Sequence, residues 1–196
     1  LKYFCENAPE YQIIAAGSLL GISLHKNSSF PVGKVETLDL YPLTFNEFVR
    51  AVSGDKLADV LMDEDASLAE TFKSRFVHLL KDYYFVGGMP EAVMAFAKNS
   101  DYSEARTVQK RITTDYERDF SKHLDARETE KVLAVWNSLP AHLAQENKKF
   151  VFGRIAKGSR AKDYESALTW LSQAGLVHVV PRITKPGIPL KAYRDS

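Results

Sequence analysis

The sequence predicts a mainly α-helical protein with some β structure: a remnant of a parallel α/β sheet, a helical middle segment and a winged helix-turn-helix. Three observations predict this fold class. A short apolar run at residues 13–16 breaks at Gly17 and Ser18, helical patterns then fill residues 47–123, and further helices precede a hairpin pattern around residues 185–187.

Two strands are expected first. Residues 13–16 (Ile-Ile-Ala-Ala) are too few for a helix and lack period-two alternation, which is typical of a strand buried on both faces. Residues 34–40 form the second strand candidate, and Pro42 ends it. Because ligands gather at the carboxyl ends of parallel strands, Ser18 would lie where a phosphate or an attacking water could sit.

The middle segment is predicted to be helical throughout. Thr44 and Glu47 form a capping box before the first helix, and the same spacing recurs at Ser67 and Asp101. Pro90 suits the first turn of another helix.

The last third combines helices and strands. Residues 128–139 form a helix that Pro140 closes, and residues 161–174 form a helix that Gly175 stops. Strands at residues 176–183 and 188–193 follow. Helices before a hairpin are typical of a winged helix, whose last helix can enter a DNA groove.

Composition sets further bounds. The 196 residues are 45% hydrophobic, enough to bury a core, and the longest apolar stretch is far too short to span a bilayer. The single cysteine, Cys5, excludes an internal disulfide and favours a reducing, cytoplasmic location. We expect it to pack the helix predicted at residues 1–7 rather than to react. The chain opens without methionine, which suggests a piece of a longer protein.

Charge is unevenly distributed. The net charge is +1, yet residues 145–196 hold ten Lys or Arg against four acids. A basic end can mark a surface for nucleic acid or for an acidic partner; a solvated charged face is the alternative.

Searches for catalytic motifs fail. Gly33 and Lys34 lack the earlier glycine and the following Ser or Thr of a phosphate-binding loop, and an apolar run ending at Asp63 is interrupted by Asp59. The five histidines have no metal-ligand spacing, so we predict no metal site.

Several segments in order resemble successive motifs of one family. They are residues 15–21 (AAGSLLG), 30–35 (FPVGKV), 40–48 (LYPLTFNEF), 84–92 (YFVGGMPEA), 119–123 (DFSKH) and 136–140 (WNSLP). The chain resembles the bacterial and archaeal AAA-type P-loop ATPases that carry a C-terminal domain of unknown function, a winged helix followed by a nuclease-like fold. The resemblance implies a fragment without Walker A and Walker B: the end of the P-loop core (residues 1–44), a helical lid (45–124) and a truncated winged-helix domain (125–196).

The resemblance also implies roles for individual residues. Ser18 is similar to the sensor 1 residue that contacts the γ-phosphate or the attacking water; capping the turn is its alternative role. Gly88 and Pro90 resemble a Gly-x-Pro motif that contacts adenine, or they simply start a helix. Lys34 faces nucleotide phosphate or is a surface lysine. Asp119 and Lys122 match a family motif whose role is undefined, and no arginine finger is located.

Two functional hypotheses follow. In the first, the intact protein binds ATP and Mg²⁺ and hydrolyses ATP, whereas this fragment is inactive and holds neither. In the second, the winged helix binds nucleic acid through Lys157, Arg160, Lys162 and Lys185, or serves as a protein-interaction module. Neither hypothesis involves a membrane, and the oligomeric state and the target remain open.

Overall fold

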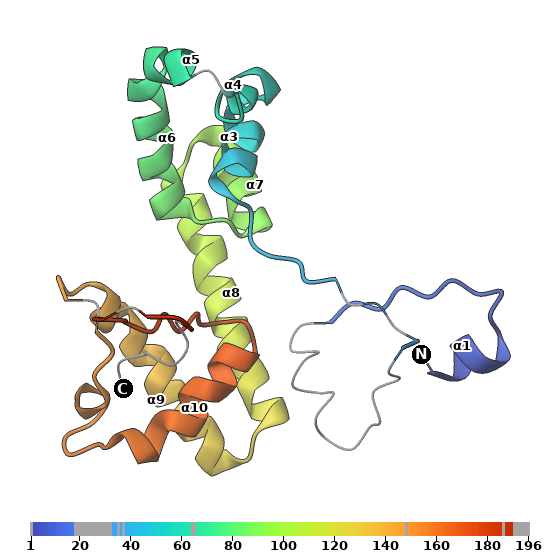
Figure 1. Ribbon diagram of the computed structural model, residues 1–196, viewed down its shortest axis with the longest axis vertical. Coiled ribbons are helices and arrows are strands. Elements are labelled where there is room, and N and C mark those ends of the chain that lie inside the picture. Colours follow the sequence, from blue (N-terminus) through green and yellow to red (C-terminus); the bar gives the residue numbers. More distant parts are fainter. Residues whose placement is uncertain are drawn as a thin grey trace. The chain divides into compact units, whose positions relative to one another are not determined.

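The computed structural model describes residues 2–17, 33–34, 36, 38–63, 66–147, 149–185 and 187–189 (Figure 1). The chain divides into two compact units. One comprises residues 37–119, and the other comprises residues 120–196 together with residues 1–36. Helix α8 (Tyr102–His123) begins in the first of these units and ends in the second.

The predicted sheet remnant is wrong, because the described residues form helices and no strand; this part of the protein is all-α. Residues 12–17 have no regular secondary structure and pair with no strand among the described residues, and Ile14 is 98% exposed. Where residues 34–40 are described, they form no strand either, and Leu38 and Leu40 are exposed. A β-strand is stabilised by pairing with a neighbouring strand and by packing one face against other residues. The described residues of these two segments form no such pairing, and their large apolar side chains are exposed.

The unit of residues 37–119 is a helical assembly. Its elements are α3 (Phe45–Ser53), α4 (Asp55–Val60), α5 (Ala66–Thr71), α6 (Lys73–Val86), α7 (Pro90–Asn99) and most of α8. The Thr44 capping box is confirmed: the Glu47 carboxylate accepts from the Thr44 amide at 2.7 Å, and the Thr44 hydroxyl accepts from the Glu47 amide at 3.4 Å. Asp101 caps α8 by accepting from the Ser103 amide at 2.7 Å. Ser67 lies inside α5, so the cap predicted there is wrong.

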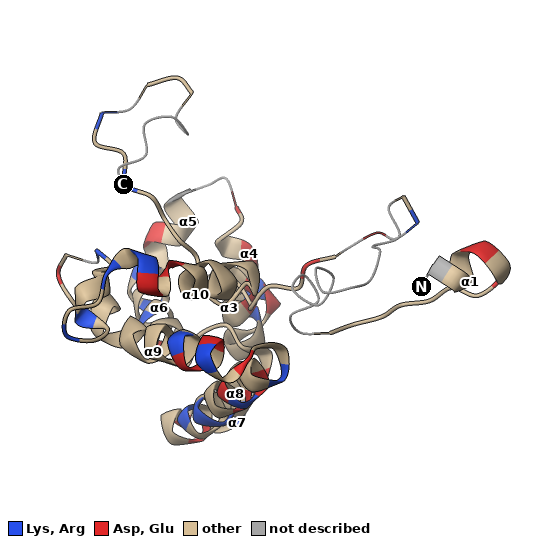
Figure 2. Ribbon diagram, turned by 90° about the horizontal axis from the view of Figure 1, so that it is seen from below, with Lys and Arg blue, Asp and Glu red and all other residues tan. Residues whose placement is uncertain are grey.

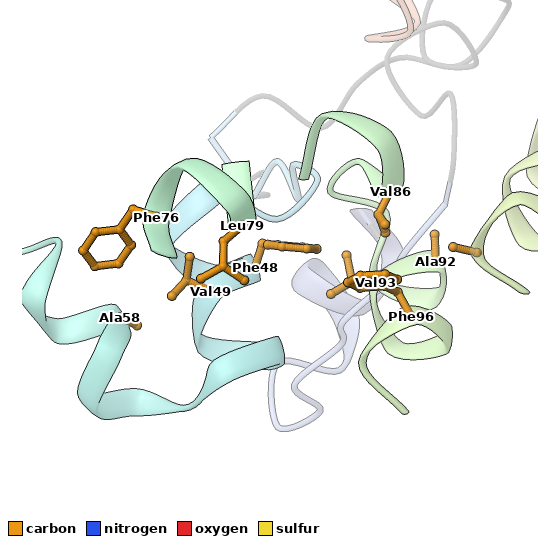
Figure 3. Packing of buried hydrophobic residues seen from close by; sticks show 10 residues of the cluster. Phe48, Val49, Ala58, Phe76, Leu79, Val86, Ala92, Val93 and Phe96 are labelled. Atoms are coloured by element: carbon orange, nitrogen blue, oxygen red, sulfur yellow. The ribbon is translucent and has the colours of Figure 1, made fainter. Parts of the chain in front are cut away.

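One hydrophobic core holds this unit together (Figure 3). Phe48 of α3, Leu79 of α6 and Phe96 of α7 are at most 2% exposed, and the Phe48 and Phe96 rings stack with their centroids 6.1 Å apart. Accordingly, α3 contacts α4, α6 and α7. Full burial of each such side chain contributes about 1.5–3 kcal/mol.

The helices of residues 120–196 pack around Phe120, the fully buried residue near the end of α8. The elements are α9 (Ala126–Leu143), the 3₁₀ helix η1 (Phe152–Arg154) and α10 (Ala161–Gln173). Trp136 of α9 and Trp170 of α10 meet the Phe120 ring edge-to-face, with centroids 5.7 and 5.4 Å away. This geometry suits the aromatic quadrupoles and joins the three helices.

Two predictions for this part are wrong. Helix α9 does not end at Pro140 but continues to Leu143. The first strand of the predicted hairpin, residues 176–183, forms no strand, and Val180 is 86% exposed. The second strand falls on residues 188–193, of which 190–193 lie outside the described residues. The winged helix-turn-helix is therefore absent from the described part of the chain.

Near the beginning of the chain, α1 (Lys2–Asn7) is a short helix, and its residues 3–7 are exposed. Cys5 on it is exposed, so the expectation that it packs is wrong. Across the helices that are described, none has the length and apolar character needed to cross a membrane.

Candidate functional site

The best-defined feature among the predicted site residues is the corner where Gly88 meets Leu43. The Leu43 amide donates to the Gly88 carbonyl at 2.7 Å, and the Tyr83 hydroxyl donates to the Leu43 carbonyl, also at 2.7 Å. Both the amide and the carbonyl of Leu43, just before α3, thus form hydrogen bonds to the region where α6 ends and α7 begins.

Only glycine fits at position 88. A Cβ placed there would lie 2.2 Å from the Leu43 carbonyl oxygen, 2.9 Å from its nitrogen and 3.1 Å from its carbonyl carbon. These are backbone atoms that cannot rotate away. The structure therefore gives Gly88 a packing role, while the adenine contact predicted for Gly88 and Pro90 stays a prediction. Pro90 is exposed at the first position of α7.

Aromatic rings support this corner. The Tyr83 ring lies 5.7 Å from the Phe45 ring and 5.4 Å from the Phe48 ring, measured between centroids. These contacts fix the Tyr83 side chain so that its hydroxyl reaches the Leu43 carbonyl. The corner is consequently continuous with the hydrophobic core of the unit.

Other predicted nucleotide contacts are placed differently or not described. The Lys34 ammonium pairs with the Glu6 carboxylate of α1. Ser18 lies outside the described residues, so its sensor role stays a prediction. Asp119 and Lys122 both have interaction partners, but their role stays undefined.

The predicted basic residues lie around the start of α10. Lys157 is in the turn before it, Arg160 is its N-cap residue and Lys162 is in its first turn; all three are exposed. Asp163 turns back so that its carboxylate accepts from the Arg160 amide at 2.9 Å. Lys185 is exposed in the segment after α10.

Two buried polar groups escaped the sequence analysis. Asp82 is 6% exposed and accepts from the Tyr102 hydroxyl at 2.6 Å, with His78 Nε2 3.7 Å away. This hydrogen bond, together with burial and the Asp82 charge, raises the pKa of Tyr102. The sequence did hold a signal for this group: Asp82 lies three residues after the core residue Leu79 and so shares its helical face. A charged residue on a buried helical face usually has a partner.

His142 is the second group. It is 4% exposed and stacks on Phe150, with centroids 4.5 Å apart. Its Nδ1 lies 2.8 Å from the Ser138 carbonyl and its Nε2 lies 3.1 Å from the Val151 carbonyl. A neutral ring can donate to one of these acceptors and a protonated ring to both. Beside it is a shallow hollow of about 320 Å³, which Asn137, Gln145 and Arg154 help to line.

Comparison with known protein families shows to which family the chain belongs. Residues 77–196 match the family described as Domain of unknown function (DUF8612). The chain belongs to this DUF8612 family. Residues 1–49 of this DUF8612 chain match the family described as AAA domain, which relates the chain to AAA-type ATPases. Searches of curated proteins and of solved structures found no significant match.

In the described part of this DUF8612 chain, no group of three or more His, Cys, Asp or Glu side chains gathers where it could hold a metal ion. We take the Leu43–Gly88 corner as the candidate site. Here the end of the AAA-matched segment meets the region that matches DUF8612.

Proposed function

We propose that this chain supplies the helical lid of an AAA-type ATPase and that the intact protein binds ATP and Mg²⁺ and hydrolyses ATP. The AAA-domain match over residues 1–49 supports the relationship. The chain has no Gly-x-x-x-x-Gly-Lys-Ser/Thr loop to cradle phosphates, so residues 1–196 should not hydrolyse ATP by themselves.

The observation that carries the proposal is a shared core. Phe48 and Val49, at the end of the AAA-matched segment, are fully buried. They pack in one cluster with Leu79, Val93 and Phe96, which belong to the family-matched region. The end of the AAA-matched region and the first part of the family-matched region are therefore built into a single helical unit.

The Leu43–Gly88 corner supports a lid that moves with the nucleotide state. Because both backbone polar groups of Leu43 are bonded to the α6–α7 region, a shift of the chain before α3 would be passed to those helices. A two-point attachment transmits displacement better than a flexible linker, as in hinge and shear closures.

The test uses the protein encoded by the complete reading frame, alongside residues 1–196. Phosphate release is measured with radiolabelled ATP. We expect turnover from the complete protein and none from residues 1–196. Ser18→Ala in the complete protein should lower kcat with little change in KM, whereas Ser166→Ala, a substitution at an exposed position of α10, should change neither.

Two outcomes contradict the proposal. One is hydrolysis by residues 1–196 that follows the protein through purification. The other is absence of turnover in the complete protein. If turnover is present but Ser18→Ala behaves like Ser166→Ala, the sensor role of Ser18 fails and the ATPase assignment stands.

The role of Lys34 can be separated in the same assay. If Lys34 contacts nucleotide phosphate, Lys34→Ala raises KM for ATP and Glu6→Gln does not. If the Lys34–Glu6 pair only stabilises α1, the two substitutions behave alike.

A further inference from the structure

We propose that the segment of residues 149–162 binds the phosphate backbone of duplex nucleic acid. Its five cations, Lys149, Arg154, Lys157, Arg160 and Lys162, are named here the basic surface. No acid occurs between residues 149 and 162. All five residues are exposed. This proposal is independent of ATP hydrolysis.

The basic surface is electrostatically unbalanced. Within the described residues, none of its five side chains forms an ion pair. Some cations elsewhere are paired: Arg50 lies 2.7 Å from Asp55 and 2.8 Å from Asp59, and α8 carries acidic and basic residues together (Figure 2). The nearest following acid, Asp163, has its carboxylate bonded to the Arg160 amide. Unpaired like charges raise the energy of the folded chain, and an anionic partner would remove that cost.

The backbone that carries these cations is held in place. Successive turns are closed by bonds from the Arg154 amide to the Val151 carbonyl at 3.1 Å and from the Ser159 amide to the Ala156 carbonyl at 3.1 Å. The 3₁₀ helix η1 contacts α10, and Phe150 stacks on the buried His142 ring. A preorganised backbone lowers the entropy that binding would otherwise cost.

The chemistry favours nucleic acid over an acidic protein. Protein interfaces are anchored by buried aromatic and apolar side chains at their centre. Between residues 149 and 162, Val151 is the one exposed large hydrophobic residue, and 37% of it is accessible. A surface with five exposed cations and one exposed large hydrophobic residue suits a phosphate backbone, whose affinity comes from neutralised phosphates and released counterions.

The test is fluorescence anisotropy of a fluorescein-labelled, mixed-sequence DNA duplex titrated with the chain. If about four phosphates are contacted, the affinity should fall roughly a hundredfold between 50 and 200 mM salt. At 50 mM salt, the triple variant Lys157→Gln, Arg160→Gln and Lys162→Gln should bind about tenfold more weakly for each phosphate that it no longer neutralises, and its salt dependence should be shallower.

The matched control is Lys56→Glu, which changes the charge of an exposed lysine on α4 outside the basic surface. It should bind the duplex within about twofold of the unmodified chain. Far-UV circular dichroism and tryptophan fluorescence establish that each variant is folded; a variant that is not folded is replaced by Lys162→Gln alone.

Three outcomes overturn the proposal. One is no duplex binding at 50 mM salt. Another is equal weakening by Lys56→Glu and by the triple variant. The last is displacement of the duplex by poly-glutamate at equal charge concentration, which would assign the basic surface to acidic proteins.

Discussion

Gly88→Ala is the substitution for which the structure predicts the clearest effect. The new Cβ would lie 2.2 Å from the Leu43 carbonyl oxygen, and real Cβ contacts essentially never fall below 3.0 Å. Since the opposing atoms are backbone, the two segments must move apart. The Leu43 amide bond to the Gly88 carbonyl, now 2.7 Å, would then stretch towards the limit of a hydrogen bond.

The cost can be worked from these contacts. Overpacking a tight site costs about 1–3 kcal/mol, and each weakened hydrogen bond costs about 1 kcal/mol. The bonds at risk are Leu43 to Gly88 and Tyr83 to Leu43. We therefore expect Gly88→Ala to lower the free energy of unfolding of residues 37–119 by about 3–5 kcal/mol.

The assay is urea unfolding with two probes. Both tryptophans, Trp136 and Trp170, lie in residues 120–196, so their fluorescence reports that unit, whereas far-UV circular dichroism reports all helices. Gly88→Ala should lower the midpoint of the dichroism transition. Gly153→Ala is the control, because a Cβ there would meet its nearest neighbour, the Ser159 carbonyl oxygen, at 3.9 Å. If Gly88→Ala changes stability by less than about 0.5 kcal/mol, the close-approach argument is refuted.

Three further predictions follow from caps and buried polar groups. Thr44→Ala should lower the free energy of unfolding, measured in urea, by about 1 kcal/mol because it removes the cap of α3. The bonds from Thr44 also lower the pKa of Glu47, so the stability that Glu47 contributes is present above pH 4.5 and is lost as the pH falls below it. Glu47→Gln should remove this pH dependence. Tyr102→Phe should lower the free energy of unfolding by about 1–3 kcal/mol because the buried Asp82 carboxylate loses its hydrogen-bond donor. Since the pKa of Tyr102 is raised, this stabilisation is present below pH 10.0 and is lost as the pH rises through the pKa of the folded state. Urea titrations at a series of pH values should therefore show this loss of stability in the unmodified chain and not in the variant. His142→Ala should cost about 2–4 kcal/mol, measured by tryptophan fluorescence, because the buried ring no longer donates to the Ser138 or Val151 carbonyl and Phe150 loses its stacking surface. An unchanged midpoint would show that the ring does not anchor this segment.

Signals that act within one helical turn were predicted from the sequence. The Thr44 capping box and Pro90 at the start of α7 each depend on residues at most three apart, and both are confirmed. Such local features can be predicted from a few residues because their bonds need no distant partner, although Ser67 has the same spacing and lies inside α5 instead of capping it. The helical character of residues 47–123 could be predicted for the same reason.

Features that depend on distant residues could not be predicted. A strand at residues 13–16 needs a neighbouring strand, and none is found among the described residues. Pro140 was expected to end α9, yet the helix continues to Leu143 while His142 bonds backward to Ser138 and forward to Val151. The Val151 contact joins residues nine positions apart, a relationship that no cap or spacing rule contains.

The candidate site shows the same division. The resemblance singled out Gly88 as a ligand contact, but the reason for glycine in this structure is the Leu43 backbone, which lies 45 positions earlier in the chain. The basic residues before α10 were predicted from charge alone, which needs no knowledge of packing. What charge could not predict is that these cations are left without ion pairs within the described residues, because pairing depends on where the acids fold.

The AAA-matched segment itself gives the last argument for the ATPase relationship. Within residues 1–49, Ile14, Leu38 and Leu40 are 98%, 86% and 89% exposed, whereas Phe48 and Val49 of the same match are fully buried. Exposed large apolar side chains are unfavourable in water, and where they gather they mark surfaces that another part covers. The helical unit covers only the last residues of the match. We infer that the remainder of an AAA core would bury the apolar residues before it, in keeping with our proposal of a larger ATPase.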